Sequence, residues 1–368
     1  MCFIDHFSAL DDPRKDINIR YDFLDIVFLT VCAVVSGAEG WKDIKQFDDE
    51  KIEWLRQYRA YPHGIPVDDT IARLIRAIEP EKMNQAFIDW VNEVRQEQGH
   101  EQIAIDGKTL RHSYQDDYGS ALRSITAWSK QQGLILAQTK SLGKKNENAS
   151  VLVLLDTLNI NGALISVDAM NKQKKIADKI ISRGADYVLC VKNNHRELRN
   201  EIAACFTKVS RDTPEYLARY EETDAGHGRT EVRRYRQLRA NEWITESAHW
   251  QGLQTVIEVE RERHTSKTGE PSREKQYYIS SLPPDVERIA GAIRSHWEVE
   301  NKAHWVLDVT FNEDDCRIRA GDGAENVAVI RRFALNLARL HPQKDSMRSK
   351  LKQAGWSDKC VLPLTETA

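Results

Sequence analysis

The chain has 368 residues, of which 41% are hydrophobic and 30% charged, a composition typical of a folded globular protein rather than a disordered one. The formal net charge of −3 gives no overall support for a nucleic-acid partner, so a DNA-binding surface would have to be a local basic patch. Six cysteines lie far apart without a CxxC pair, which favours reduced cytosolic thiols over a disulfide framework or a structural zinc site.

Residues 1–95 have the apolar spacing of helices. The run FLDIVFLTVCAVVSGA contains Asp25 and is shorter than the roughly 20 apolar residues of a membrane span, so we expect a buried helix. No basic stretch precedes it, which argues against a signal peptide. In GIPVDDTIARLIRAI, Asp68 or Asp69 is the expected N-cap. This helical segment braces its neighbour, supports dimerisation or contacts DNA. Because the sequence contains no apparent basic recognition helix, bracing or dimerisation is favoured over DNA contact.

From about residue 100 the pattern becomes that of an α/β domain. Three strand-like runs, QIAIDGKTLR, ALRSITAWSK and GLILAQTKSL, are separated by turn-rich segments. A helix, a strand, a second helix and a second strand follow, in NASVLVLLDTL, ALISVDA, KQKKIADKIISRG and DYVLCVK. Three consecutive strands followed by this alternation predict a mixed sheet with helices on its faces. Ligands bind such sheets at the strand ends where the strand order reverses.

Residues 196 to about 284 interrupt the α/β pattern. They begin with the helical run RELRNEIAACF and continue with the strand-like runs RTEVRRYRQL, LQTVIEVERER and EKQYYISSL. We interpret this segment as a β-rich insertion. Helices are expected again from Asp285 to about 311 and from about 324 to 340, before a polar C-terminal tail.

Two aspartates stand at the ends of predicted strands. Asp106 ends the first strand, and Asp168 ends the fourth. Either residue alone is more often a solvated turn or a helix cap than a functional group. Two carboxylates on neighbouring strands repel each other unless a positive charge lies between them, and Mg²⁺ favours carboxylate oxygens. The pair therefore predicts a divalent metal site at this edge of the sheet.

A third ligand is expected on the predicted helix VERIAGAIRSHWEVENKAHWVLDV, whose apolar stripe consists of Val286, Ile289, Ile293, Trp297 and Leu307. At about 100° per residue, Glu300 lies within about 20° of Ile293, whereas Glu298 lies about 140° away. Glu300 is therefore expected to point inward and Glu298 outward. An inward glutamate needs a partner, which is either a metal shared with the aspartates or a buried basic residue such as Arg294.

Several segments together carry a resemblance: PVDDTIAR, IDGK, KKNEN, VDAMNKQKKIA, GADYVLCVKNNH, YYISSL and HWEVENKAHWVLDVTFNED. Over about residues 5–340 the chain resembles the H-repeat-associated transposases, a branch of the DDE insertion-sequence transposases. The resemblance implies an α/β fold with a ribonuclease-H-like mixed sheet flanked by helices, a β-rich insertion and an N-terminal all-helical domain. The implied domains are a helical transposase-associated domain at 1–95, a DDE catalytic domain at 96–340 with the insertion at about 196–284, and a tail at 341–368.

The resemblance also implies that Asp106, Asp168 and Glu300 are the catalytic and metal-binding residues, holding two Mg²⁺ ions with Mn²⁺ as a substitute. Two metal ions about 3.5–4 Å apart can activate a nucleophile and stabilise the leaving oxygen in phosphodiester displacement. The expected enzyme cleaves the DNA ends of an insertion sequence and transfers the freed 3′-hydroxyl to target DNA. Its implied partners are double-stranded DNA, as element ends and target, and a second copy in a homodimer on DNA. A cytoplasmic location, on the nucleoid when DNA is bound, and no membrane partner are expected.

Three residues depart from the pattern of the wider superfamily, which usually has arginine at His296, tyrosine at Ile293 and lysine at Leu307. Arg294 and Lys302 are the candidate replacements for those groups, but neither stands at the matching offset. Two alternatives to an active transposase follow. One is a catalytically silent DNA-binding remnant, and the other is a ribonuclease-H-like nuclease that cleaves DNA without strand transfer.

Basic residues near the predicted strand ends and on the insertion are candidates for phosphate contacts, although a solvated surface position is the commoner role of a lysine. The glycines of GHGR permit close approach of the backbone to a phosphate, or equally a tight hairpin turn. DNA contacts are expected at Lys108, Lys145, Lys192, His227, Arg229, Arg233 and Arg294. Because phosphate contacts carry no sequence information, they do not predict which DNA ends are recognised.

Overall fold

A computed structural model describes residues 3–15, 19–95, 101–110, 123–141, 147–168, 173–226, 229–265 and 268–357. The chain forms two compact units, and each unit is assembled from separate stretches of sequence. Unit 1 consists of Met1–Glu97, Gly107–Lys144 and Glu300–Ala368. Unit 2 consists of Gln98–Asp106 and Lys145–Val299. No helix within the described part of the chain is long and apolar enough to cross a membrane.

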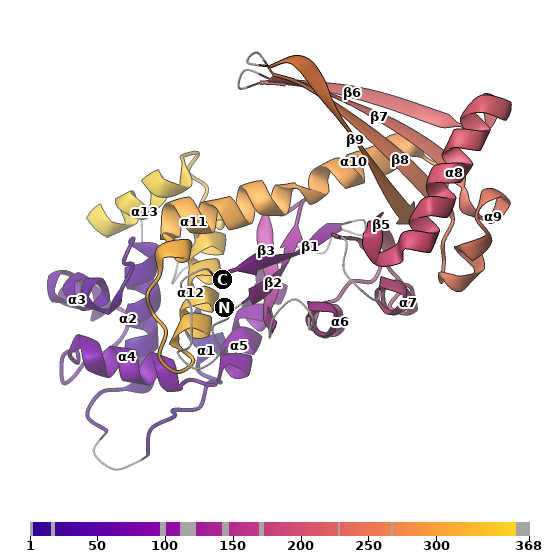
Figure 1. The fold of residues 1–368 in the computed structure, drawn as a ribbon. Coiled ribbons are helices and arrows are strands. Elements are labelled where there is room, and N and C mark those ends of the chain that lie inside the picture. The colour runs from indigo at the N-terminus through magenta and orange to yellow at the C-terminus, as the bar shows by residue number, and fades with distance from the viewer. Residues whose placement is uncertain are drawn as a thin grey trace. The chain divides into compact units, whose positions relative to one another are not determined.

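Unit 1 is built mainly from helices (Figure 1). These helices are α1 (Phe3–Phe7), α2 (Phe23–Val35), α3 (Trp41–Leu55), α4 (Asp68–Ala77), α5 (Pro80–Val94), α11 (Trp305–Phe311), α12 (Gly323–Leu340) and α13 (Met347–Trp356). Helix α12 packs against α2, α4 and α5, and its residues from Asn326 to Ala338 are all buried. Its Asn326 donates from Nδ2 to the backbone oxygens of Ile75 and Ile78 at 2.8 and 2.9 Å, which fixes the end of α4.

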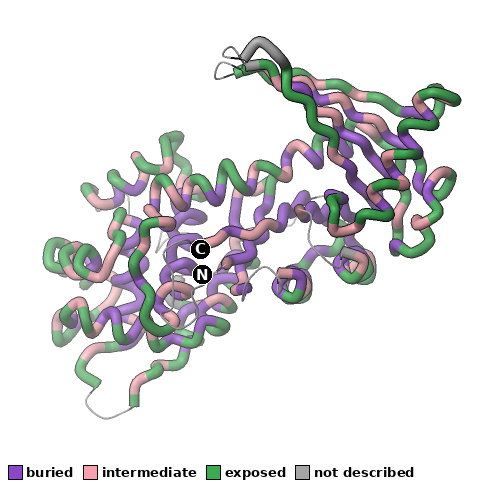
Figure 2. Tube along the Cα trace, in the orientation of Figure 1, coloured by how far each residue is buried: buried purple, intermediate pink, exposed green. Residues whose placement is uncertain are grey.

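Helix α2 is the buried helix that the sequence predicts, and Figure 2 shows the contrast with α3, which has exposed residues over much of its surface. The buried Asp25 receives a hydrogen bond from Arg59 Nε at 2.7 Å, so this charge is compensated inside the unit. The predicted N-cap of α4 is wrong by one residue. Val67 occupies that position without a side-chain cap, and Asp68 and Asp69 instead lie in the first turn, where carboxylates favour the helix dipole.

Among the described residues nine strands form one sheet in the order β3-β2-β1-β4-β5-β9-β8-β7-β6. The strands are β1 (Gln102–Thr109), β2 (Arg123–Ser129), β3 (Leu134–Ser141), β4 (Leu164–Val167), β5 (Asp186–Val191), β6 (Ala218–Gly226), β7 (Arg229–Arg239), β8 (Thr255–Thr265) and β9 (Thr268–Ser280). Strands β2 and β3 form an antiparallel hairpin, whereas β4 is parallel to both β1 and β5. The predicted α/β class with a mixed sheet is therefore confirmed.

Unit 2 combines the central strands with helices and with the β-rich insertion. Its helices are α6 (Glu147–Thr157), α7 (Gln173–Ser182), α8 (Arg196–Asp212), α9 (Ala240–Trp243) and α10 (Val286–His296). Helices α6 and α7 pack on each other, and α7 packs on β5. Figure 1 shows α8 along the antiparallel strands β6 to β9, which continue the sheet beyond β5.

The core of the insertion is shared with α10. Tyr235 and Ile257 from the insertion pack with Ile289 and Ile293 of α10 and with Val188 of β5 in one buried cluster. The strand β6 was not predicted from the sequence because most of its residues are exposed and give no apolar alternation. Helix α10 therefore packs against both the insertion and the central strands and joins them in one core.

Candidate active site

Asp106 and Asp168 come directly after paired residues of two neighbouring parallel strands. The register of β1 and β4 runs from Gln102↔Leu164 to Ile105↔Val167, and both aspartates belong to unit 2. Because neighbouring strands lie about 4.7–4.9 Å apart, the two residues that follow the last pair start close together. The sequence left open whether the strands of these two carboxylates are neighbours, and the register shows that they are.

The sequence suggested that Asp106 ends its strand, and this prediction is wrong. Strand β1 continues to Thr109, so Asp106 is its fifth residue, and only the pairing with β4 stops at Ile105. Both aspartates are partly exposed, whereas the residues before them in β1 and β4 are buried. A carboxylate at this point leaves the core where its partner strand ends, which avoids most of the cost of burying a charge.

Asp168 is already paired with a cation from the next strand. Lys192 follows β5 directly, and its Nζ donates to Asp168 Oδ1 at 2.9 Å and to Oδ2 at 3.1 Å. The two side chains are 52% and 47% exposed, so the pair is at the surface of unit 2. Asp168 raises the pKa of Lys192 against the opposing effect of partial burial, and the ammonium group is therefore charged at neutral pH.

A set of polar side chains on the strands before the two aspartates, here called the polar ladder, attaches the end of α10 to β1 and β4. Gln102 donates from Nε2 to the Ala292 backbone oxygen at 2.8 Å and accepts from Ser295 Oγ at 2.6 Å. His296 Nδ1 lies 3.0 Å from Ser166 Oγ, two residues before Asp168. The sequence reasoning did not identify this ladder, although a glutamine at the start of the apolar run QIAI is a signal that could have indicated it.

His296 is a neutral residue of this ladder. Burial lowers the pKa of His296 to about 4, with a small opposing effect from Asp168 and a further lowering by Lys192. The imidazole is therefore uncharged at pH 7, unlike the arginine that the wider superfamily usually has at this position. It holds the helix end by hydrogen bonding to Ser166 rather than by charge.

The prediction that Glu300 points inward is wrong, because the helix changes its winding. A π-helix at Val299–His304 follows α10, so a constant 100° per residue does not describe this segment. Val299, Ala303 and Leu307 are buried, whereas Glu300 is exposed and Glu298 is partly exposed. Trp297, also expected in the stripe, is 36% exposed and has the Arg261 guanidinium 5.7 Å from the centre of its ring.

Glu300 belongs to unit 1, whereas the two aspartates belong to unit 2, and its role as a third ligand stays a prediction. The alternative partner Arg294 is excluded, because Arg294 Nη2 donates to Asp224 Oδ2 of β6 at 2.7 Å. In the described stretches of the chain, no three His, Cys, Asp or Glu side chains lie close enough to hold a metal ion. The donor set nevertheless suits a hard divalent cation, since carboxylate oxygens are its preferred ligands and Asp168 already holds a cation, the Lys192 ammonium group, on both oxygens.

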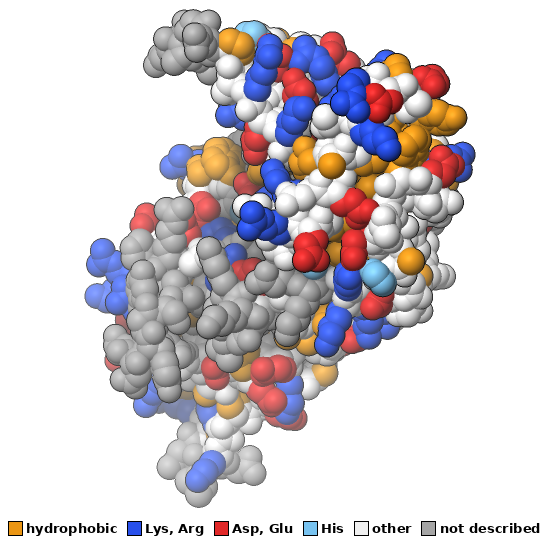
Figure 3. Space-filling model, turned by 45° about the vertical axis from the view of Figure 1, so that its right-hand side comes forward, with side chains coloured by type: hydrophobic (Ala, Val, Ile, Leu, Met, Phe, Trp, Pro, Cys, Tyr) orange, Lys and Arg blue, Asp and Glu red, His pale blue; other side chains and the backbone are white. Residues whose placement is uncertain are grey.

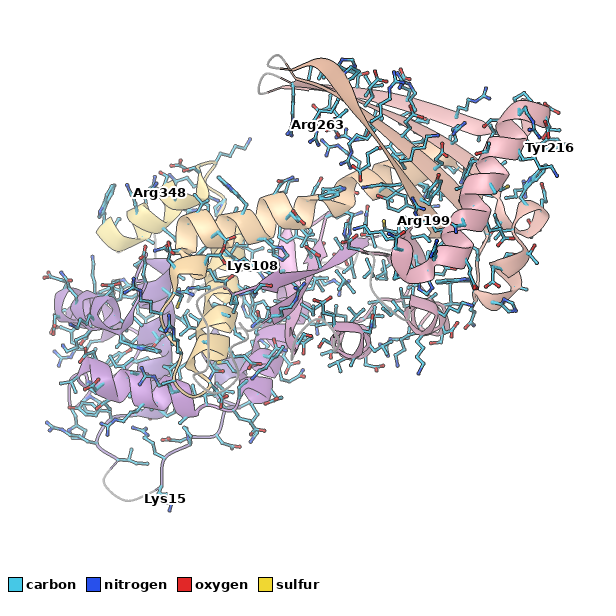
Figure 4. All side chains as sticks on the ribbon, viewed as in Figure 1. Lys15, Lys108, Arg199, Tyr216, Arg263 and Arg348 are labelled. Atoms are coloured by element: carbon cyan, nitrogen blue, oxygen red, sulfur yellow. The ribbon has the colours of Figure 1, made fainter. Side chains whose placement is uncertain are left out.

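Lys108 does not offer the exposed ammonium group that a phosphate contact needs. Its side chain is only 7% exposed, and its Nζ contacts carboxylate oxygens of Asp308, Glu313 and Asp314 at 2.5, 3.2 and 3.1 Å, all within unit 1 (Figure 4). Glu313 in turn accepts from Arg332 Nη1 at 2.7 Å, and both of these side chains are buried. Lys108 is therefore part of a buried ion-pair network, which corrects its assignment to DNA.

The other predicted DNA contacts divide into three groups. Arg233 is buried beside Glu231 and Glu222, and so it is not available to a phosphate as expected. Arg229 is exposed, and Arg294 is partly exposed but paired with Asp224. Lys145 and His227 lie outside the described residues.

Basic and acidic side chains alternate on the insertion rather than forming a uniformly basic patch. Arg234 donates to Glu221 at 2.8 Å and to Glu262 at 2.7 Å, and Arg236 pairs with Glu258. Figure 3 shows blue and red side chains interspersed on the upper part of the visible face. These arginines are therefore compensated by carboxylates of the insertion itself.

Two protein families match the chain. The transposase DDE domain family matches residues 97–337, and the family of domains associated with it matches residues 4–91. YhhI of Escherichia coli K12, named as a candidate H repeat-associated transposase, is 39% identical over 95% of this chain and 94% of its own length. A protein named as a candidate transposase, YncI of Escherichia coli O157:H7, is 38% identical over 91% of this chain and 87% of its own.

Among solved structures, the piggyBac transposase synaptic complex with hairpin DNA matches at 12% identity and a TM-score of 0.41, over 99% of this chain and 75% of that chain. A similarity of this size does not establish a shared fold. The family matches, by contrast, cover the segments on which the carboxylates and the ladder lie. The chain therefore belongs to the family of DDE-domain transposases.

Proposed function

We propose that this protein is a metal-dependent transposase that cleaves the DNA ends of an insertion sequence and joins them to target DNA. The observation that carries the proposal is the position of Asp106 and Asp168, which follow a register pair of neighbouring parallel strands, with a cation on Asp168. The third carboxylate is Glu300, exposed at the start of the π-helix. Membership of the DDE family supports this choice of residues.

In this proposal the carboxylates hold two Mg²⁺ or Mn²⁺ ions, which when bound activate an oxygen nucleophile and stabilise the leaving oxygen. Asp106 is positioned by the register of β1, and Asp168 by the end of β4 and by the ladder of Ser166 and His296. The residues themselves form no covalent bond to DNA. Water is the first nucleophile, and the freed 3′-hydroxyl is the second.

Double-stranded DNA is the proposed substrate, with a homodimer acting on paired element ends. Exposed basic groups contact phosphates, of which Arg229 at the start of β7 is the best placed, and Lys145, Lys192, His227 and Arg294 remain candidates. Because phosphate contacts contribute affinity without sequence reading, other groups must identify the element ends.

The test supplies labelled DNA containing the sequences that flank the coding region, with Mg²⁺, to the full chain and to Asp106→Asn, Asp168→Asn and Glu300→Gln. Joined products that each substitution abolishes support the proposal, since every carboxylate is needed to hold the metal pair. Asp156→Asn is the matched control, because Asp156 is a half-exposed aspartate of unit 2 that pairs with Lys179. Joining that survives all three catalytic substitutions would refute the proposal.

A catalytically silent remnant is the second candidate, and one observation favours it. Ile293 and Leu307, at the positions where the superfamily usually has tyrosine and lysine, are both buried and therefore cannot contact DNA. A silent remnant binds the labelled DNA without cleaving it. A nuclease of the same fold cleaves it without forming joined products, so the same assay separates all three.

A further inference from the structure

We infer that Lys192 is an internal counter-ion of the metal site, which holds Asp168 in the metal-free protein and has to be displaced before a divalent cation binds. The inference rests on the proposed function, because it assumes that Asp106 and Asp168 are metal ligands. It assigns to Lys192 a role different from that of a permanent DNA contact.

The geometry supports displacement rather than permanent pairing. The ammonium group lies 2.9 and 3.1 Å from the two oxygens of Asp168, so it occupies the side of the carboxylate that a metal would need. Asp106 follows the neighbouring strand in register, so the two carboxylates start side by side and a cation beside them reduces their repulsion. Lys192 provides one positive charge in this position, and a divalent ion would provide two.

Exposure makes the exchange feasible. About half of each side chain is accessible to solvent, and an exposed pair of this kind is held weakly. By contrast, Lys108, on the same strand as Asp106, is buried among three carboxylates and cannot leave without uncompensated charge. Lys192 can therefore leave Asp168 at little cost, since its long and flexible side chain can extend into solvent.

The inference predicts that removing the ammonium group strengthens metal binding. Mn²⁺ binding to the full chain without DNA is measured by electron paramagnetic resonance for the unsubstituted protein, Lys192→Met and Lys192→Arg. Lys192→Met should lower the Kd by at least about threefold, since an exposed ion pair of typical strength no longer competes. Lys192→Arg, which keeps the charge, should leave the Kd within about twofold of the unsubstituted value.

Lys179→Met is the matched control for the change in net charge. Lys179 also pairs with an aspartate of unit 2, Asp156, but away from the carboxylate pair, and its substitution should not change the Kd. An unchanged or weaker affinity in Lys192→Met, with Mn²⁺ binding otherwise intact, overturns the inference and leaves the proposed function standing. If the protein binds no Mn²⁺, or if Asp106→Asn leaves Mn²⁺ binding unchanged, the metal site itself is refuted, and this inference with it.

A second measurement needs no substitution and so does not depend on the folding of a variant. Acetylation of lysines in the unsubstituted chain is followed by mass spectrometry, with and without Mg²⁺ at constant ionic strength. Mg²⁺ should increase the labelling rate of Lys192 at least about twofold, as the ammonium group is released, while Lys179 remains unchanged. Labelling of Lys192 that is unaffected or reduced by saturating Mg²⁺ contradicts the displacement.

Discussion

Replacing Glu313 by glutamine removes the central charge of the buried network around Lys108. The environment lowers the pKa of Glu313 to about 2, because the positive charges of Arg332 and Lys108 outweigh the opposing effect of burial. Compared with the ordinary glutamate pKa of 4.5, this lowering corresponds to about 3 kcal/mol of stability at pH 7. Loss of one partner of a buried ion pair costs about 3–5 kcal/mol, which agrees.

The pH dependence gives the prediction its sign. A carboxyl whose folded pKa is depressed stabilises the protein above its unfolded pKa, and this contribution is lost as the pH falls through the folded pKa. The difference between the unsubstituted protein and Glu313→Gln should therefore be complete above about pH 5.5 and fall by more than half by about pH 3.

Urea unfolding followed by tryptophan fluorescence at pH 7 and pH 3 measures both quantities. Glu53→Gln is the control in the same unit, since Glu53 pairs with Arg56 at an 81% exposed position and should change stability by less than about 0.5 kcal/mol. A loss below about 1 kcal/mol for Glu313→Gln at pH 7, or a loss that is equal at both pH values, would show that the network does not act as a buried charge cluster.

Two further predictions concern one residue in each unit. Asn336→Ala should lower the free energy of unfolding, measured by urea unfolding, by about 2–4 kcal/mol. The buried Asn336 side chain accepts from the Ile135 N–H at 2.9 Å and donates to the Ile135 oxygen at 2.8 Å, and both backbone groups lose their partner in the variant. A loss below about 1 kcal/mol contradicts this prediction. The ring of His296 should titrate below about pH 5 by NMR, since burial disfavours its charged form, and a pKa of 6 or more would contradict that effect of burial.

Much of the fold was predictable because its signals are local. Helix α2 has an apolar run too short for a membrane, and the strands β4 and β5 are short apolar runs bounded by turns. These features depend on spacing and composition, which the sequence displays directly. The sequence allowed the strands of Asp106 and Asp168 to be neighbours without requiring it, and the parallel pairing of β1 and β4 is known only from the structure.

The orientation of Glu300 was not predictable from spacing, because the calculation assumes a constant 100° per residue. The segment does not keep that winding, because a π-helix follows α10, and Val299 rather than Glu300 is the buried residue. The burial of Lys108 was missed for a different reason. Its partners Asp308, Glu313 and Asp314 lie about 200 residues further along the chain, and no local pattern indicates such a contact.

The discontinuity of unit 1 has a consequence for synthesis on the ribosome. Its N-terminal helices emerge first, but the helix on which α2, α4 and α5 pack is α12, which is translated more than 200 residues later. Until then those helices expose the apolar faces that α12 will cover, and nascent chains with such faces are prone to aggregate or to recruit chaperones. A product interrupted between residues 300 and 322 would retain every residue of unit 2 yet leave the early helices permanently without their central partner.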